Sequence, residues 1–137
     1  MPAASNEVLR EPIHVLVVDD DPDIALMLED RLDAMGTIVL IARNGEDAVR
    51  HLDTSPVDAV LLDIEMPRMS GIEALRMIRT RFPTLPVFMM TAVSNTDRLN
   101  EALQEGATGY LPKPINFNEM EQVLRNLFPS RLAGPER

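Results

Sequence analysis

The chain has 137 residues, 45% of them hydrophobic, so it is long enough to bury one core and we expect a single domain. Its 22 acidic and 13 basic residues give a formal charge of -9, which argues against binding of nucleic acid or an anionic membrane by this domain alone. The absence of cysteine rules out a disulfide framework and thiolate metal sites. No apolar run approaches the roughly 20 residues of a membrane span, and the N-terminal segment lacks the layout of a signal peptide.

Five short apolar runs alternate with stretches of helical spacing. The predicted strands are 13–18, 37–42, 59–62, 87–90 and 109–111. Apolar residues recur at helical spacing within 24–35, 72–82 and 120–127, and weaker helices are predicted near 45–53 and 97–105. Three of the helices carry start signals, which are Asp21 before Pro22, a capping box from Ser70 to Glu73, and Asn116 three residues before Glu119.

Five strands, each followed by a helix, predict an α/β, doubly wound domain with a parallel sheet and helices on both faces. We expect the domain to span 13–128, with an N-terminal extension at 1–12 and a C-terminal tail at 129–137, both poorly ordered. Ligands of such sheets bind beyond the carboxyl ends of the strands. The residues at those ends are therefore the candidates for chemistry.

Polar side chains lie at four of the predicted strand ends, which should converge on one small surface. They are Asp19 and Asp20 after the first strand, Asp63 after the third, Thr91 after the fourth and Lys113 after the fifth. Carboxylates 4 Å apart repel by about 4 kcal/mol at an effective dielectric constant near 20, and a divalent cation would offset this. An all-oxygen ligand set suits Mg²⁺ or Mn²⁺, whose incomplete protein shell implies a phosphoryl ligand. Taken alone, however, the first acidic run could simply cap a helix through Asp21.

Asp63 favours the metal and phosphoryl interpretation, because a carboxylate at a strand end can attack a phosphoryl group when cations neutralise the charge on its oxygens. Lys113 can supply part of that charge. It is the single lysine beside twelve arginines, and it stands between Pro112 and Pro114. Thr91 offers a hydroxyl on the same rim, although threonine at a strand end is often only a turn former.

Five motifs, found in four stretches of the chain, carry a resemblance to a known family. The first-strand acids lie in "VLVVDDD", Asp63 in "LLDIEMPRMSG", Thr91 in "MMTA", and an aromatic residue and Lys113 in "GATGYLPKP". From about Ile13 to Phe128 the chain resembles the receiver domain of bacterial two-component response regulators. The resemblance implies a flavodoxin-like (βα)5 fold with strand order 2-1-3-4-5 and a cytoplasmic, phosphorylation-activated signalling role.

The resemblance also assigns roles to the strand-end residues. It makes Asp63 the phosphoacceptor. Mg²⁺ is expected to be bound by Asp20, Asp63 and the backbone carbonyl of Glu65, with Asp19 acting through water. Lys113 is expected to contact the phosphoryl group, with a cis peptide bond between Lys113 and Pro114. We expect the domain to catalyse only its own phosphorylation and dephosphorylation.

Thr91 and Tyr110 correspond to the switch pair of the family, in which the hydroxyl closes on the phosphoryl group and the aromatic ring turns inward. An aromatic side chain that merely packs on an edge strand is the alternative for Tyr110. Glu65 and Val93 occupy positions that vary in the family and affect the lifetime of the phosphoryl group.

The resemblance implies two partners. A sensor histidine kinase or phosphotransfer protein would donate the phosphoryl group, and a downstream protein or output domain would read the face of the fourth helix, fifth strand and fifth helix. A phosphorylation-dependent dimer, and the choice between a stand-alone receiver and a piece of a larger regulator, stay open.

Two other protein classes are alternatives. A phosphatase of the haloacid dehalogenase type also uses aspartates, threonine, lysine and Mg²⁺, but its nucleophile would follow the first strand within a pattern such as Asp-x-Asp-Gly-Thr, and "DDDPD" lacks Gly-Thr. A flavodoxin or dinucleotide-binding protein is disfavoured because no Gly-x-Gly-x-x-Gly or phosphate loop follows the first strand.

Overall fold

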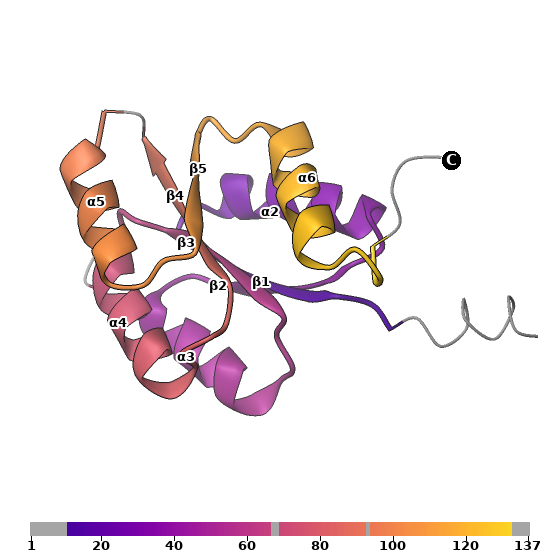
Figure 1. The fold of residues 1–137 in the computed structure, drawn as a ribbon, viewed down its shortest axis with the longest axis horizontal. Coiled ribbons are helices and arrows are strands. Elements are labelled where there is room, and N and C mark those ends of the chain that lie inside the picture. The colour runs from indigo at the N-terminus through magenta and orange to yellow at the C-terminus, as the bar shows by residue number, and fades with distance from the viewer. Residues whose placement is uncertain (1–10, 67–68, 93, 133–137) are drawn as a thin grey trace, which may run out of the picture.

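The fold is built on one parallel sheet. The structure, a computed structural model, describes residues 11–66, 69–92 and 94–132. The strands are β1 (His14–Val18), β2 (Ile38–Ala42), β3 (Ala59–Asp63), β4 (Val87–Ala92) and β5 (Gly109–Lys113). They pair in the order β2-β1-β3-β4-β5, and all four pairings are parallel (Figure 1). The predicted strand order and doubly wound architecture are therefore confirmed.

Helices cover both faces of the sheet. They are α2 (Pro22–Ala34), α3 (Gly45–Thr54), α4 (Gly71–Arg81), α5 (Thr96–Gln104) and α6 (Phe117–Leu127). Helices α2 and α6 lie on one face, and α3, α4 and α5 lie on the other (Figure 1). Among the described residues, no helix is both long enough and apolar enough to cross a membrane.

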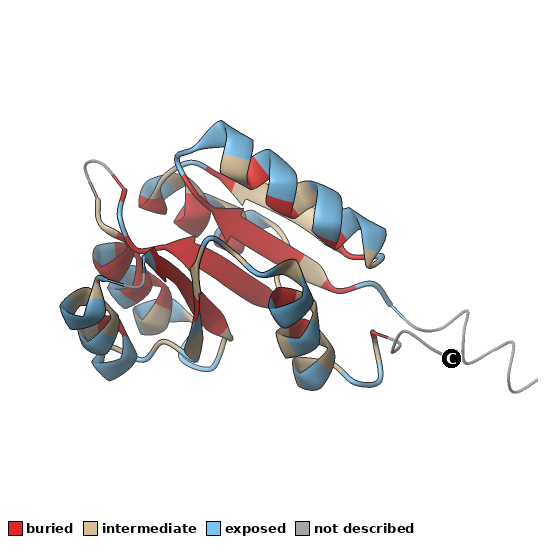
Figure 2. Cartoon of the chain, turned by 90° about the horizontal axis from the view of Figure 1, so that it is seen from above, coloured by how far each residue is buried: buried red, intermediate tan, exposed pale blue. Residues whose placement is uncertain are grey.

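The hydrophobic core has two layers because successive strand residues point to opposite faces. In β1, Leu16 and Val18 pack beneath α3 and α4, while Val15 and Val17 pack beneath α2 and α6. The central strands β1, β3 and β4 are thus buried on both faces, whereas the edge strands β2 and β5 are partly exposed and the helices alternate buried with exposed residues (Figure 2). Burial on both faces explains why β1, β3 and β4 read as continuous apolar runs in the sequence.

Three strands are longer than the sequence predicts, because the ladder continues past their apolar residues. The pairing extends to Asp63 opposite Met90, and to Ala92 opposite Lys113. Asp63 and Lys113 are therefore the last residues of their strands, and Thr91 lies within β4. Backbone hydrogen bonds, rather than loop conformation, hold these three positions.

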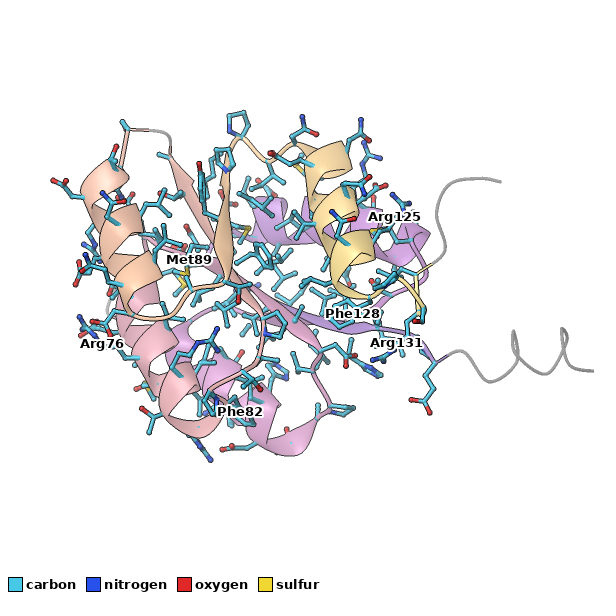
Figure 3. All side chains as sticks on the ribbon, in the orientation of Figure 1. Arg76, Phe82, Met89, Arg125, Phe128 and Arg131 are labelled. Carbon is cyan, nitrogen blue, oxygen red and sulfur yellow. The ribbon has the colours of Figure 1, made fainter. Side chains whose placement is uncertain are left out.

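The expectation of poorly ordered ends is wrong for residues 129–132, while residues 1–10 and 133–137 lie outside the described part of the chain. Leu132 is only 6% exposed and joins the core beneath α2 and α6. The Arg131 guanidinium donates to both carboxylate oxygens of Asp58, at 3.2 Å each, and to the carbonyl of Pro12 at 3.0 Å. It also lies 5.8 Å from the centre of the Phe128 ring (Figure 3). The predicted domain boundary at residue 128 stays a prediction.

We predict that Leu132→Ala lowers the free energy of unfolding by about 2 kcal/mol, because it removes buried methyl groups and leaves a cavity. Chemical denaturation followed by circular dichroism measures the change. Leu26→Ala, at an exposed position of α2, is the matched control and should change stability by less than about 0.5 kcal/mol. Equal stability of the two variants would contradict the packing of the chain end.

Candidate functional site

The predicted site residues meet at the carboxyl edge of the sheet. Asp19 and Asp20 follow β1, and the N–H of Asp19 donates to the carbonyl of Ala42 at 3.0 Å, which extends the ladder between β1 and β2. Asp63 ends β3 and Lys113 ends β5. The parallel topology thus brings together side chains that lie up to 94 positions apart in the sequence.

The carboxylates form a compact cluster. Ligand oxygens of Asp19, Asp20 and Asp63 all lie within 4.8 Å of one another. Asp19 is 1% exposed and Asp63 is 3% exposed, whereas Asp20 lies open to solvent. The N–H of Asp21 donates to Oδ1 of Asp19 at 2.9 Å.

The cluster fits a hard divalent cation. Oδ2 of Asp19 is buried and has no hydrogen-bond partner within the described residues. A buried carboxylate oxygen without a partner is costly unless a water molecule or a cation satisfies it. Three carboxylates with one such oxygen are a ligand set suited to Mg²⁺ or Mn²⁺, which take oxygen ligands and retain waters.

Burial dominates the acid–base behaviour of the cluster. It raises the pKa of Asp19 from 3.8 to about 6, although the hydrogen bond from Asp21 acts in the opposite direction. Burial also raises the pKa of Asp63, and this effect outweighs the lowering by Lys113. Both carboxyl groups therefore ionise less readily than exposed aspartates.

Lys113 is the counter-charge of the cluster. Its Nζ donates to Oδ1 of Asp63 at 2.8 Å, across 50 positions of sequence. Burial lowers the pKa of Lys113, but the hydrogen bond and the charges of Asp63, Asp19 and Glu65 raise it, and the net direction is upward. The predicted cis bond between Lys113 and Pro114 is present.

Sequence reasoning missed Gly71, which supports the loop that follows Asp63. Its N–H donates to the carbonyl of Ile64 at 2.8 Å, and a Cβ at this position would lie 2.1 Å from the carbonyl oxygen of Asp63. Only glycine permits this approach without moving the backbone of Asp63. Its place in the "SGIE" capping box was visible in the sequence, but the contact depends on how the loop folds back. The same loop directs the N–H of Glu65 to Oδ1 of Asp63 at 3.3 Å.

The two predicted switch residues lie on β4 and β5, outside the carboxylate cluster. Thr91 is 3% exposed, and its hydroxyl donates to the carbonyl of Ala92 at 3.2 Å rather than to Asp63. Tyr110 is opposite Met89 in the ladder, so its side chain is on the same face of the sheet as Met89 and Thr91, yet it is 48% exposed. Val93 lies outside the described residues.

The chain is similar to proteins of one family. Residues 15–125 match the response regulator receiver domain family. The transcriptional regulatory protein ZraR of Salmonella typhimurium is 36% identical over 130 residues, which cover 94% of this chain and 30% of ZraR. The DNA-binding transcriptional regulator NtrC of Escherichia coli is 42% identical over 105 residues, which cover 77% of this chain and 22% of NtrC. The chain thus spans less than a third of the length of these two relatives.

Solved structures give the same result. The chemotaxis protein CheY4 of Vibrio cholerae matches with a TM-score of 0.81 and 28% identity, covering 86% of this chain and all of CheY4. The receiver domain of the Francisella response regulator 1452 matches with a TM-score of 0.78 and 29% identity, over 87% of this chain and 98% of that one.

The fold, the carboxyl-edge cluster and these similarities define a receiver module of two-component signalling. The chain belongs to the response regulator receiver domain family. Members of this family are activated by phosphorylation of an aspartate, so the phosphatase and dinucleotide-binding alternatives are set aside.

The raised pKa of Asp19 predicts a pH dependence of stability. Between pH 3.8 and about 6 the folded chain holds this proton while the unfolded chain has lost it, so the free energy of unfolding falls as the pH rises through that window. Chemical denaturation in a chelator at pH 4, 5 and 6 measures the slope. Asp19→Asn should flatten it, and a slope of the same size in this variant would contradict the assignment.

Proposed function

We propose that this chain accepts a phosphoryl group on Asp63 from a histidine kinase or phosphotransfer protein and changes conformation in response. The observation that carries the proposal is the hydrogen bond from Lys113 to Asp63 beside two further carboxylates. This arrangement combines a nucleophile, a cation and the ligands for a metal, which are the parts that phosphoryl transfer needs.

In the proposed step, a carboxylate oxygen of Asp63 attacks the phosphorus atom of a donor phosphohistidine. The new oxygen–phosphorus bond forms as the phosphorus–nitrogen bond breaks, and the electron pair leaves on the imidazole nitrogen. Lys113 neutralises charge on the phosphoryl oxygens from one side of the carboxylate. The hydrogen bond from the N–H of Glu65 orients the carboxylate for the attack.

Asp20, Asp63 and the carbonyl of Glu65 would hold Mg²⁺, with Mn²⁺ as the alternative, and Asp19 would act through a water molecule. The cation supplies charge stabilisation on the transferring phosphoryl oxygens. The buried Oδ2 of Asp19, which has no hydrogen-bond partner within the described residues, supports this role for Asp19 because it is free to accept a hydrogen bond from such a water molecule. The domain would catalyse only its own phosphorylation and dephosphorylation.

Thr91 and Tyr110 would transmit the change. After transfer, the hydroxyl of Thr91 would leave the carbonyl of Ala92 and donate to a phosphoryl oxygen. This movement would open space on the face of the sheet that Thr91 shares with Tyr110, and the exposed ring would turn into it. The surface that a partner recognises would be the face formed by α5, β5 and α6.

A downstream protein or output domain would read that face, and a phosphorylation-dependent dimer through the same face is the second form of output. ZraR and NtrC are named as transcriptional regulators, and control of transcription by the protein to which this chain belongs is part of the proposal. A cytoplasmic location belongs to it as well, because transcription in bacteria takes place there.

We predict that Asp63→Asn abolishes phosphorylation, because the amide is not a nucleophile toward phosphorus. A small phosphodonor with Mg²⁺ should add one acid-stable, base-labile phosphoryl group to the parent, measured by intact mass. Asp30→Asn, an exposed change on α2, is the matched control and should be labelled like the parent. Label that persists in Asp63→Asn would refute the assignment of the phosphoacceptor.

We predict that Lys113→Arg keeps the fold and the affinity for Mg²⁺ but accepts the phosphoryl group about tenfold more slowly. In this variant, phosphorylation should no longer change the conformation around Tyr110. A guanidinium is wider than an ammonium and forks toward two oxygens, so it misplaces the charge. Backbone amide exchange around Tyr110 with and without beryllofluoride measures coupling, and Lys113→Ala shows the effect of removing the charge. A response in Lys113→Arg as large as the parent's would show that charge alone suffices.

A further inference from the structure

Four of the five described helices begin in the same way, and α5 does not. At each of these four N-caps the backbone is extended and a side-chain oxygen accepts a hydrogen bond from an N–H of the first turn; the caps are Asp21, Asn44, Ser70 and Asn116. The residue at the N-cap of α5 is Asn95, a residue type as well suited to capping as the others. Its ψ angle is 55°, however, and within the described residues its side chain makes no capping hydrogen bond.

The Asn95 amide is used elsewhere. Its Nδ2 donates to Oε2 of Glu65, 30 positions earlier in the chain, in a short hydrogen bond. Glu65 is also the residue whose N–H donates to the carboxylate of Asp63. The amide therefore connects the first turn of α5 to the loop that orients Asp63, and it does so at the expense of the helix cap.

Helix α5 is lightly held, so its cap matters. Within α5, all of which the structure describes, Ala102 alone is buried. Its charged contacts with α4 are exposed pairs, from Arg76 to Glu101 and Glu105, both at 3.2 Å, and Figure 3 shows Arg76 beside this helix. Exposed pairs of this kind contribute little, so the start of α5 depends on the bond from the Asn95 side chain to Glu65 and on the backbone bond from the N–H of Asn95 to the carbonyl of Ala92 at 3.0 Å.

We propose that Asn95 is a positioning residue that exchanges between two hydrogen-bond partners. In the unphosphorylated chain its amide holds Glu65, and in the phosphorylated chain its side-chain oxygen caps α5 at the N–H groups of Asp97 and Arg98. This inference rests on the proposed phosphorylation of Asp63. It adds a second route from the site to α5, separate from Thr91 and Tyr110.

Charge drives the exchange. Phosphorylation replaces the single negative charge of the Asp63 carboxylate by the about 1.5 to 2 negative charges of a phosphoryl group. Lys113, which bonds Asp63, also feels the negative charge of the Glu65 carboxylate, so the added charge lies within reach of the Glu65 carboxylate. Repulsion moves this carboxylate away and releases the Asn95 amide. The released side chain then satisfies N–H groups at a helix N-terminus, where a hydrogen-bond acceptor is favoured.

The first experiment needs no phosphorylation. Glu65→Ala removes the competing partner, and Asn95→Asp keeps a capping side chain but cannot donate to Glu65 and is repelled by it. In both variants the protection of the Arg98 amide against hydrogen exchange should rise about fivefold over the parent, the effect expected of a formed cap. The double variant Glu65→Ala with Asn95→Ala has no capping side chain and should lose this gain.

The second experiment adds beryllofluoride and Mg²⁺ to the parent, with amide resonances of Asp63 and Lys113 as the independent report of binding. The Arg98 amide should gain about fivefold protection on binding, and Asn95→Ala should not show the gain although the reagent binds. Glu65→Gln retains an acceptor oxygen for the Asn95 amide. Without beryllofluoride its Arg98 amide should therefore stay as weakly protected as in the parent, unlike that of Glu65→Ala. This comparison separates loss of the hydrogen bond from loss of the side chain.

Unchanged protection in both Glu65→Ala and Asn95→Asp would overturn the exchange. Binding of beryllofluoride without a change at Arg98 would also overturn it, while leaving the proposed function intact. If the reagent does not bind at Asp63, the proposed function fails, and the unphosphorylated variants still decide whether Asn95 exchanges its partners.

Discussion

The hydrogen-bonded ion pair between Lys113 and Asp63 reduces the repulsion among the carboxylates at the C-terminal ends of the strands. Three carboxylates lie within 4.8 Å there, two of them buried, and each pair costs about 4 kcal/mol at 4 Å with an effective dielectric constant near 20. One ammonium offsets only part of that repulsion. The raised pKa values of Asp19 and Asp63 and the unpaired oxygen of Asp19 are the remaining imbalance. In the proposed function a divalent cation would offset the remaining negative charge, and the phosphoryl group would then add to it.

The molecule divides into a rigid part that holds the charges and a lightly held part that can respond. Asp63 ends a strand buried on both faces, and Lys113 is fixed by the ladder between β4 and β5. Helix α5 buries only Ala102 and is tied to α4 through exposed ion pairs. A change of charge at the rigid edge therefore moves α5 and its loop at a lower free-energy cost than it moves β3, because little buried surface has to be exposed.

The opposite edge of the sheet is tied together by Arg131. Its bonds to Asp58 and Pro12 join the segment after α6 to the residues that precede β1 and β3. Asp58 and Asp63 are separated by the length of β3, roughly 17 Å at about 3.3 Å per residue. The contacts of Arg131 thus lie far from the carboxylates, so the end of the sheet that anchors the chain and the end that carries the candidate site are distinct.

The sequence alone determined the elements and the edge on which the chemistry lies, because apolar periodicity and capping residues act within a few positions and parallel strands place their carboxyl ends together. Asp63 and Lys113 could be selected on that basis. Only the tertiary structure decided which atoms meet: that Lys113 reaches Oδ1 of Asp63, that Gly71 must lack a side chain, and that Asn95 bonds Glu65 instead of capping its own helix. The reason is physical. An N-cap residue has a local partner that the sequence can predict, but a partner 30 or 50 positions away competes with it only after the sheet and loops have packed.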